Sequence, residues 1–264
     1  TTSEQLKQLL NTTTSEKVML TQGFIAGAPD GSTTTLGREG SDYTAAVIAN
    51  ILYAEKLVIW KDVPGIMNAD PRYFDNPGKL DRISYQEAIE LAYYGAKVIH
   101  PKTIKPLQNK NIPLYVKSFI EPEKEGTLVG EYKRYDQDKP IFILKKNQML
   151  ISILPRDFSF VFEETMSKIY GIFARHRIRV NLIQNSAINF TVCVDRDNTR
   201  IDALMEDLKT DYRVLYNTSL ELLTIRHYTE HVVHQVQKGR NIMVEQRSRH
   251  TAQFVLSSGE EGRH

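Results

Sequence analysis

The chain has 264 residues, of which 41% are hydrophobic and 25% charged, which is an ordinary composition for a globular protein. Its 34 basic and 32 acidic residues give a net charge of +2, so the charge balance indicates neither a nucleic-acid nor a membrane partner. The apolar runs are too short to cross a bilayer, and the first residues are too polar for a secretory signal. The single cysteine, Cys193, excludes an internal disulfide framework and favours a reducing, cytoplasmic location.

The first half of the chain predicts alternating strands and helices. The expected strands are 18–25, 57–60 and 113–117. Helical spacing of apolar residues predicts a helix over 43–55, and the capping-box pattern at 84–87 predicts a second helix that ends near Gly95. This alternation is typical of an α/β sheet layered with helices.

A polar, charged connection at about 121–140 separates this half from the next, and we place the domain boundary there, between 1–133 and 134–264. Beyond it the expected strands are 148–154, 180–183, 189–194, 220–225, 242–245 and 253–256, and the expected helices are 162–176, 201–208 and 230–237. This order predicts two ferredoxin-like modules in tandem. The second module is short by a strand and a helix, and 141–144 is the candidate for the missing strand.

A glycine-rich stretch, TTTLGREGSDYTAA at 33–46, leads into the first of these helices. Ser41 is a good N-cap and Asp42 suits the helix dipole, so a tight turn before a helix explains the pattern without any function. The same arrangement is equally an anion site, because free backbone N–H groups point outward at a helix start. Arg38 adds a planar guanidinium that matches a carboxylate or a phosphate.

Two further segments follow the ends of predicted elements. WKDVPGIMNADPR at 60–72 leaves the carboxyl end of an apolar strand, where open α/β sheets bind ligands. GAKVIHP at 95–101 places Lys97 in a loop after a C-capping glycine. Each segment alone is a weak signal, because solvated surface charges and ordinary turns give the same patterns.

Together and in this order, four segments resemble the second half of an aspartokinase, in the amino-acid kinase family. The segments are GFIAG (23–27), TTTLGREGSD (33–42), WKDVPGIMNADPR (60–72) and GAKVIHP (95–101). The later segment 168–195 resembles the first ACT module of aspartokinases. The resemblance implies an α/β fold: the C-terminal part of an α/β/α amino-acid kinase sandwich, followed by two ferredoxin-like (βαββαβ) ACT modules.

The resemblance implies ATP-dependent phosphorylation of the L-aspartate side chain to 4-phospho-L-aspartate, the first step of lysine, threonine and methionine biosynthesis. ATP and Mg²⁺ are the implied cofactors, and a homodimer through the ACT modules is the implied assembly. Arg38 and Ser41 are the implied substrate-binding residues, and Asp42 and Lys97 have the implied catalytic role around the phosphates. The implied nucleotide-binding residues are Lys61, Asp62, Met67, Arg72, Lys97 and Val98.

The sequence departs from the family at several positions. Lys61 stands where many relatives have a small hydroxyl residue, and Met67 stands where a tyrosine is common. The Lys-Phe-Gly-Gly loop that opens the family's kinase domain, with its phosphate-binding lysine, has no counterpart here. We therefore expect a fragment that starts within the kinase domain and is inactive alone.

The resemblance also implies an amino-acid effector site, for lysine or threonine, at Asn181, Gln184, Asn185 and Ser186. Asn181 and Ala187 stand where an aspartate and a glutamate are usual, so the preference for lysine is expected to be reduced and neutral amino acids to compete. Glu163 or Glu164 would restore that preference by supplying the missing charge.

Other functions remain open. One is a non-catalytic amino-acid-sensing ACT fragment, and another is a kinase of glutamate or acetylglutamate, which the ACT segment disfavours. His227, His231 and His234 share helical spacing, but no cysteine or clear acidic ligand accompanies them, so no metal site is predicted. Cys193 is expected to be a small buried hydrophobic residue.

Overall fold

The computed structural model has two compact units, Thr1–Gln137 and Asp138–His264. It describes residues 2–12, 18–97, 99–132, 139–157, 160–196 and 199–257. The predicted boundary between residues 133 and 134 lies outside these ranges and stays a prediction. Among the described helices, none has the length and apolar character needed to cross a membrane.

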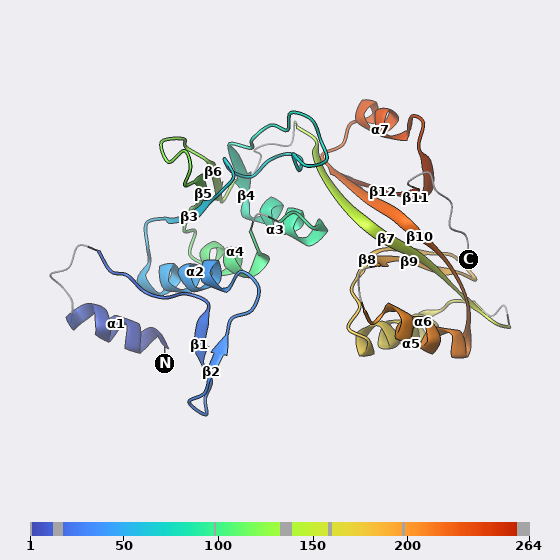
Figure 1. Ribbon diagram of the computed structural model, residues 1–264, viewed down its shortest axis with the longest axis horizontal. Coiled ribbons are helices and arrows are strands. Elements are labelled where there is room, and N and C mark those ends of the chain that lie inside the picture. The colour runs from blue at the N-terminus through green and yellow to red at the C-terminus, as the bar shows by residue number, and fades with distance from the viewer. Residues whose placement is uncertain are drawn as a thin grey trace. The chain divides into compact units, whose positions relative to one another are not determined.

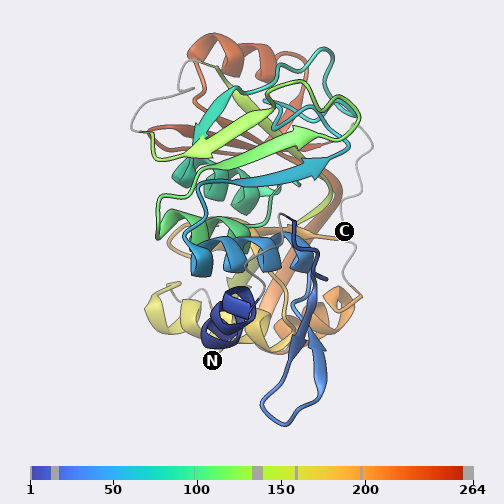
Figure 2. The same ribbon diagram turned by 90° about the vertical axis from the view of Figure 1, so that its left-hand side faces the viewer.

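The first unit is built on a four-stranded mixed sheet with the order β3-β5-β6-β4. The strands are β3 (Leu57–Lys61), β4 (Arg82–Ser84), β5 (Leu114–Ser118) and β6 (Thr127–Gly130). β3 runs parallel to β5 and β4 parallel to β6, whereas β5 and β6 are antiparallel. Three helices, α2 (Gly40–Leu52), α3 (Tyr85–Tyr94) and α4 (Pro101–Gln108), lie along one side of this sheet (Figures 1 and 2). Helix α1 (Thr2–Thr12) precedes them.

Capping residues set the bounds of the central helices. The Ser84 hydroxyl accepts a hydrogen bond from the Glu87 N–H at 3.0 Å, and Gly95 ends α3 with a φ of 117°. His100 Nδ1 accepts from the Lys102 N–H at 3.1 Å and starts α4. The N-cap that the capping-box pattern predicted at Ser84 and the C-capping glycine are therefore confirmed.

Two predictions at the start of the first unit are wrong. Residues 18–24 form no strand; instead β1 (Ile25–Gly27) and β2 (Thr33–Thr35) make an antiparallel hairpin. An apolar run such as 18–20 predicts a strand only if it finds a pairing partner and a core, and Val18 and Leu20 are exposed. Ser41 is also not the N-cap, because α2 already begins at Gly40, after Glu39.

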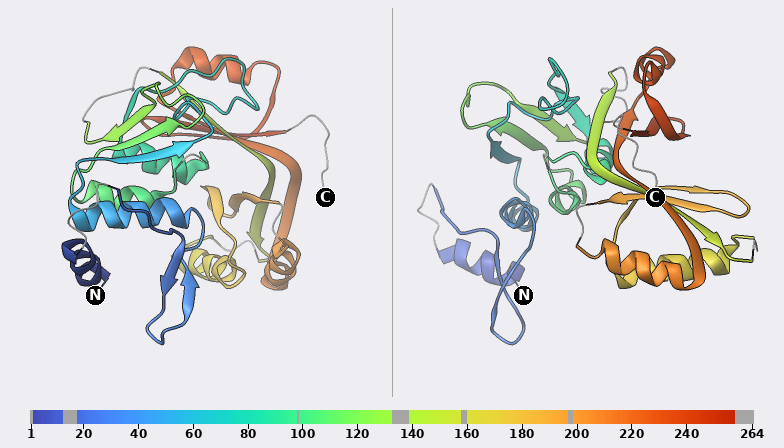
Figure 3. Two further views of the ribbon diagram at one scale, coloured as in Figure 1. Left: turned by 60° about the vertical axis from the view of Figure 1, so that its left-hand side comes forward. Right: turned by 45° about the vertical axis from the view of Figure 1, so that its right-hand side comes forward.

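The second unit contains one six-stranded antiparallel sheet with the order β11-β12-β10-β7-β9-β8. Its strands are β7 (Ile141–Pro155), β8 (Val180–Asn185), β9 (Phe190–Asp195), β10 (Tyr212–Arg226), β11 (Asn241–Arg247) and β12 (Thr251–Ser257). β7 and β10 pair along most of their lengths, with an irregularity between Asn217 and Leu222 (Figures 1 and 3). The predicted strands 148–154 and 220–225 are thus parts of two longer strands.

The two long strands are shared by two modules. The later part of β7 and the first part of β10 join β8, β9, α5 (Glu163–Arg175) and α6 (Ile201–Asp211) in the order βαββαβ. The first part of β7 and the later part of β10 join β11, β12 and one described helix, α7 (Glu230–Gln237). Residues 141–144 therefore do supply the missing strand of the second module.

Side chains of β7 alternate between two apolar clusters, as the two-residue period of a strand requires. Met149, Ile151 and Ile153 join the core that contains buried residues of α5 and α6. Leu150 joins a smaller cluster that includes Cys193 on β9, whose side chain is fully buried as predicted.

Candidate functional site

The first two predicted motifs form one local structure at the start of α2. The Leu36 N–H donates to the Phe24 carbonyl at 2.8 Å, and the Phe24 N–H donates to Thr44 Oγ1 at 3.1 Å. A Cβ on Gly40 would lie 2.8 Å from Phe24 Cδ2, which explains the glycine. Glu39 takes the left-handed φ of 55° before the helix, and its side chain does not cap it. The helix start is therefore fixed by packing. The Gly40 N–H donates to the Gly37 carbonyl at 3.0 Å, and within the described part of the chain no side chain bonds the first N–H groups.

The third motif reaches this helix start through an ion pair. Lys61, the last residue of β3, places its Nζ 2.8 Å from Oδ2 of Asp42 in the first turn of α2. Arg38 and Ser41 are exposed nearby in sequence, and Arg38 makes no ion pair with another residue that the structure describes. The structure thus brings Asp42 and Lys61 together, a contact that the separate motifs did not predict.

The loop after β3 is held at its base by Thr127 of β6. Thr127 Oγ1 accepts from the Ile66 N–H at 2.8 Å and donates to the Leu80 carbonyl at 2.6 Å. Gly65 has a φ of 151°, and a Cβ there would lie 2.5 Å from Thr127 Oγ1. This glycine is required both by backbone conformation and by the approach of the threonine. The loop is therefore anchored to the sheet at its base.

The same loop carries an ion pair between Arg72 and Asp70, and Lys97 of the fourth motif influences this carboxylate. Nε and Nη2 of Arg72 donate to the carboxylate of Asp70, the latter at 2.6 Å. The hydrogen bond from Arg72 holds the pKa of Asp70 below its ordinary value, and the charge of Lys97 lowers it further. Lys97 therefore lies close enough to influence the loop, and Asp62 is exposed. The side chain of Met67 is half-buried, whereas Val98 lies outside the described residues.

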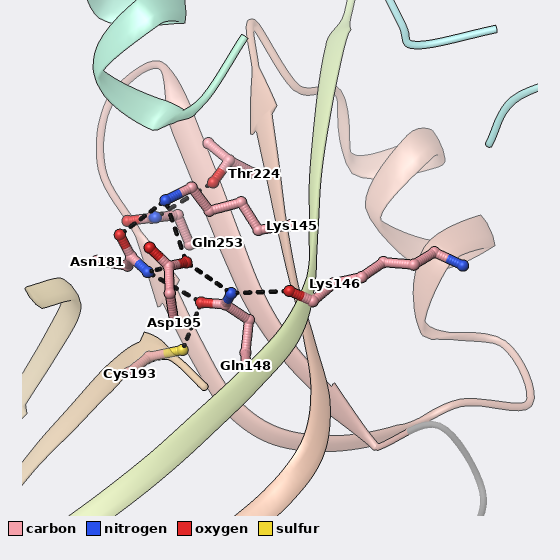
Figure 4. A network of polar contacts seen from close by, with 8 residues as sticks. All are labelled: Lys145, Lys146, Gln148, Asn181, Cys193, Asp195, Thr224 and Gln253. Atoms are coloured by element: carbon pink, nitrogen blue, oxygen red, sulfur yellow. Dashed lines mark hydrogen bonds and ion pairs between the residues drawn. The ribbon is translucent and has the colours of Figure 1, made fainter. Parts of the chain in front are cut away.

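In the second unit, the candidate effector residue Asn181 belongs to a polar network (Figure 4). Its Oδ1 accepts from Lys145 Nζ at 2.8 Å, and its Nδ2 donates to Gln148 Oε1 at 2.9 Å and to Asp195 Oδ1 at 3.0 Å. Gln184, Asn185 and Ser186 are exposed, three to five residues further along the chain. The Asn181 side chain is therefore held by hydrogen bonds within the network, whereas the other three candidates are exposed.

Three residues of this network, Lys145, Gln148 and Asp195, were not predicted from the sequence. Burial lowers the pKa of Lys145, and the charge of Asp195 opposes that shift. Burial raises the pKa of the Cys193 thiol, whose Sγ lies 3.5 Å from Gln148 Oε1, to about 12. The available signal was Gln148 itself, the polar first residue of a predicted strand, which requires internal partners when buried.

Residues 1–118 match the sequence profile described as the Amino acid kinase family. Lysine-sensitive aspartokinase 3 of Escherichia coli K12 is 36% identical over 220 residues, which cover 80% of this chain and 48% of that protein. A bifunctional aspartokinase/homoserine dehydrogenase of Buchnera aphidicola is 36% identical over 195 residues, covering 72% and 24%. The chain thus spans about half of the first relative's length and about a quarter of the second's.

Solved structures show the same relationship. Aspartokinase III of E. coli, in complex with lysine and aspartate, superposes with a TM-score of 0.78 at 32% identity, over 97% of this chain and 60% of that one. Clostridium acetobutylicum aspartate kinase has a TM-score of 0.80 at 21% identity, over 96% and 62%, which supports the fold alone. The predicted fold class is confirmed. Residues 1–118 therefore match the amino acid kinase family, and the chain is a homologue of aspartokinases over most of its length, with part of a kinase domain followed by two ferredoxin-like modules.

Proposed function

We propose that the protein containing this chain is an aspartate kinase, which transfers the terminal phosphoryl group of ATP to the side-chain carboxylate of L-aspartate. The observation that carries the proposal is the ion pair between Asp42, in the first turn of α2, and Lys61, at the carboxyl end of β3. Phosphoryl transfer requires positioning of both substrates and neutralisation of charge on the phosphate oxygens. A helix N-terminus and a cationic side chain supply both requirements.

The proposed roles follow the places of the side chains. Exposed Arg38, beside Ser41, is free to bind the planar carboxylate of aspartate, and Asp42 and Lys97 organise the charges around the phosphates. Lys61, Asp62, Met67, Arg72, Lys97 and Val98 form the proposed nucleotide-binding set. ATP supplies the phosphoryl group and Mg²⁺ additional positive charge, while the residues of this chain bind and orient the substrates.

Kinetics of the full-length protein test these roles. Arg38→Ala should raise the KM for aspartate with little change in kcat, whereas Asp42→Asn should mainly lower kcat. Formation of the acyl phosphate is followed as its hydroxamate, with glutamate and acetylglutamate as alternative substrates. An unchanged aspartate KM in Arg38→Ala would refute the assignment, and the absence of turnover with all three substrates would favour a non-catalytic sensing protein. The isolated 264-residue chain should show no turnover.

We also propose a homodimer, formed through the ACT modules, that binds an amino-acid effector at Asn181, Gln184, Asn185 and Ser186. One support is the E. coli relative, whose structure contains lysine. Lysine should bind weakly here, because the oxygen of Asn181 already accepts from the chain's own Lys145 and carries no negative charge. Titration calorimetry with lysine, threonine and methionine tests the preference, and tight binding of lysine alone would contradict it. We also propose that the protein is soluble and cytoplasmic, and the single cysteine, Cys193, supports a reducing compartment.

A further inference from the structure

Lys61 is a cation in an unusual place. It ends β3, and its ammonium lies against the first turn of α2, where the helix dipole places about half a positive charge. A lysine there is repelled by the helix end unless an anion shares the position. In the described part of the chain that anion is Asp42, whose Oδ2 accepts from Lys61 Nζ at 2.8 Å.

The burial of this pair distinguishes it from the neighbouring ion pairs. The side chains of Lys61 and Asp42 are 27% and 18% exposed, so both carry charge with limited access to water. In each of the other ion pairs described for the first unit, at least one side chain is more than half exposed. A surface pair of that kind contributes little, whereas loss of one partner from a shielded pair leaves the other charge poorly solvated. Removal of either residue would therefore leave the charge of the other without its partner.

Two positive charges lie at this position. The ammonium of Lys61 and the partial positive charge of the helix end both face the carboxylate of Asp42, and the N-cap residue Glu39 makes no side-chain bond to the helix. A polyphosphate carries several negative charges and binds both ammonium groups and helix N-termini. It therefore competes with Asp42 for Lys61.

We propose that Lys61 is a nucleotide-binding residue whose ammonium is paired with Asp42 until the nucleotide binds. In the free protein its ammonium is bound to the Asp42 carboxylate, and it is transferred to a phosphate oxygen of the nucleotide when the nucleotide binds. Asp42 thus weakens nucleotide binding by competing for Lys61, and the carboxylate is released for the reacting site only when the nucleotide is present. This inference deepens the proposed kinase function and depends on it.

A double-mutant cycle on ADP binding to the full-length protein tests the exchange. Titrations in EDTA remove any contact of Asp42 with a metal ion from the measurement. Lys61→Met should weaken ADP binding about tenfold, because a hydrogen bond from a charged donor is lost. Asp42→Asn should strengthen ADP binding about threefold or more in the parent protein, and should have no such effect when Lys61 is already methionine.

Two further variants separate binding from folding. Lys61→Arg should retain most of the ADP affinity, and Lys124→Met, which removes an exposed ion pair of the same unit, should leave it unchanged. If Lys61 only stabilises the fold, Lys61→Met will lower the Tm and leave ADP affinity unaltered. If the parent protein binds ADP, that result would overturn the proposed exchange of Lys61 between Asp42 and the nucleotide. An Asp42→Asn variant that binds ADP no more tightly than the parent would overturn it as well. Failure of the parent protein to bind ADP would instead overturn the proposed kinase function and this inference with it.

Discussion

Replacement of Thr127 by valine should loosen the base of the loop that follows β3. Valine has nearly the same shape, but it removes the bond accepted from the Ile66 N–H at 2.8 Å and the bond donated to the Leu80 carbonyl at 2.6 Å. Thr127, Ile66 and Leu80 are all buried, so water does not replace the lost partner. Each lost hydrogen bond costs about 1 kcal/mol, and a backbone group left without a partner costs about 1–3 kcal/mol. We expect the first unit to lose about 2–4 kcal/mol of unfolding free energy.

The assay is urea unfolding followed by fluorescence of Trp60, the single tryptophan of the chain, which lies in β3 of the same unit. The midpoint should fall in Thr127→Val with little change in the m-value. Thr127→Ser is the matched control, because it keeps the hydroxyl and loses only a buried methyl group, at about 1 kcal/mol. Equal losses in the serine and valine variants would show that the methyl group, and not the two hydrogen bonds, anchors the loop.

Two more predictions concern buried groups. Burial raises the pKa of the Cys193 thiol to about 12, so the thiol should not react with a disulfide reagent at pH 8 in the folded chain. It should react fully once the chain is unfolded in urea. Rapid reaction of the folded chain would contradict the buried placement. Tyr85→Phe removes the hydrogen bond that the phenol donates to the Ile112 carbonyl at 2.6 Å, and should lower the unfolding free energy by about 1–3 kcal/mol in the Trp60 assay, whereas an unchanged midpoint would show that this bond adds no stability.

Local signals account for the elements that the sequence predicted well. Helix α7 was predicted at 230–237 and has those bounds, because Thr229 caps it by accepting from the Val232 N–H at 3.3 Å. Ser84 and Gly95 bound α3 in the same way. Such contacts lie within a few residues of one another, so a pattern in the sequence is sufficient to predict them.

Contacts between distant segments account for what was missed. β7 continues through the polar residues Lys145 to Gln148 because the segments on both sides of them pair with β10, whose first part was not predicted as a strand. The sequence supplied Asp42 and Lys61 as separate candidates, but their ion pair depends on how α2 packs beside β3. Ser41 failed as an N-cap because the packing of Gly40 against Phe24 starts the helix earlier.

The polar network around Asp195 predicts how the stability of the second unit depends on pH. Burial alone would raise the pKa of Asp195, but the hydrogen bond from Gln148, the charge of Lys145 and the bond from Asn181 outweigh it and hold the pKa below the ordinary value. A carboxyl group with a lowered pKa in the folded state stabilises that state above its unfolded pKa of about 4, and the contribution is lost as the pH falls through the lower, folded value.

The second unit should therefore lose stability below about pH 4, and Asp195→Asn should be less stable than the parent at pH 7 and nearly equal to it at the acid end of this range. Urea unfolding by circular dichroism from pH 2.5 to 7 measures the difference, with Asp202→Asn, an exposed carboxylate of α6, as the control. A gap between Asp195→Asn and the parent that stays constant with pH would mean that the amide disturbs packing, and that the Asp195 charge contributes nothing to folding.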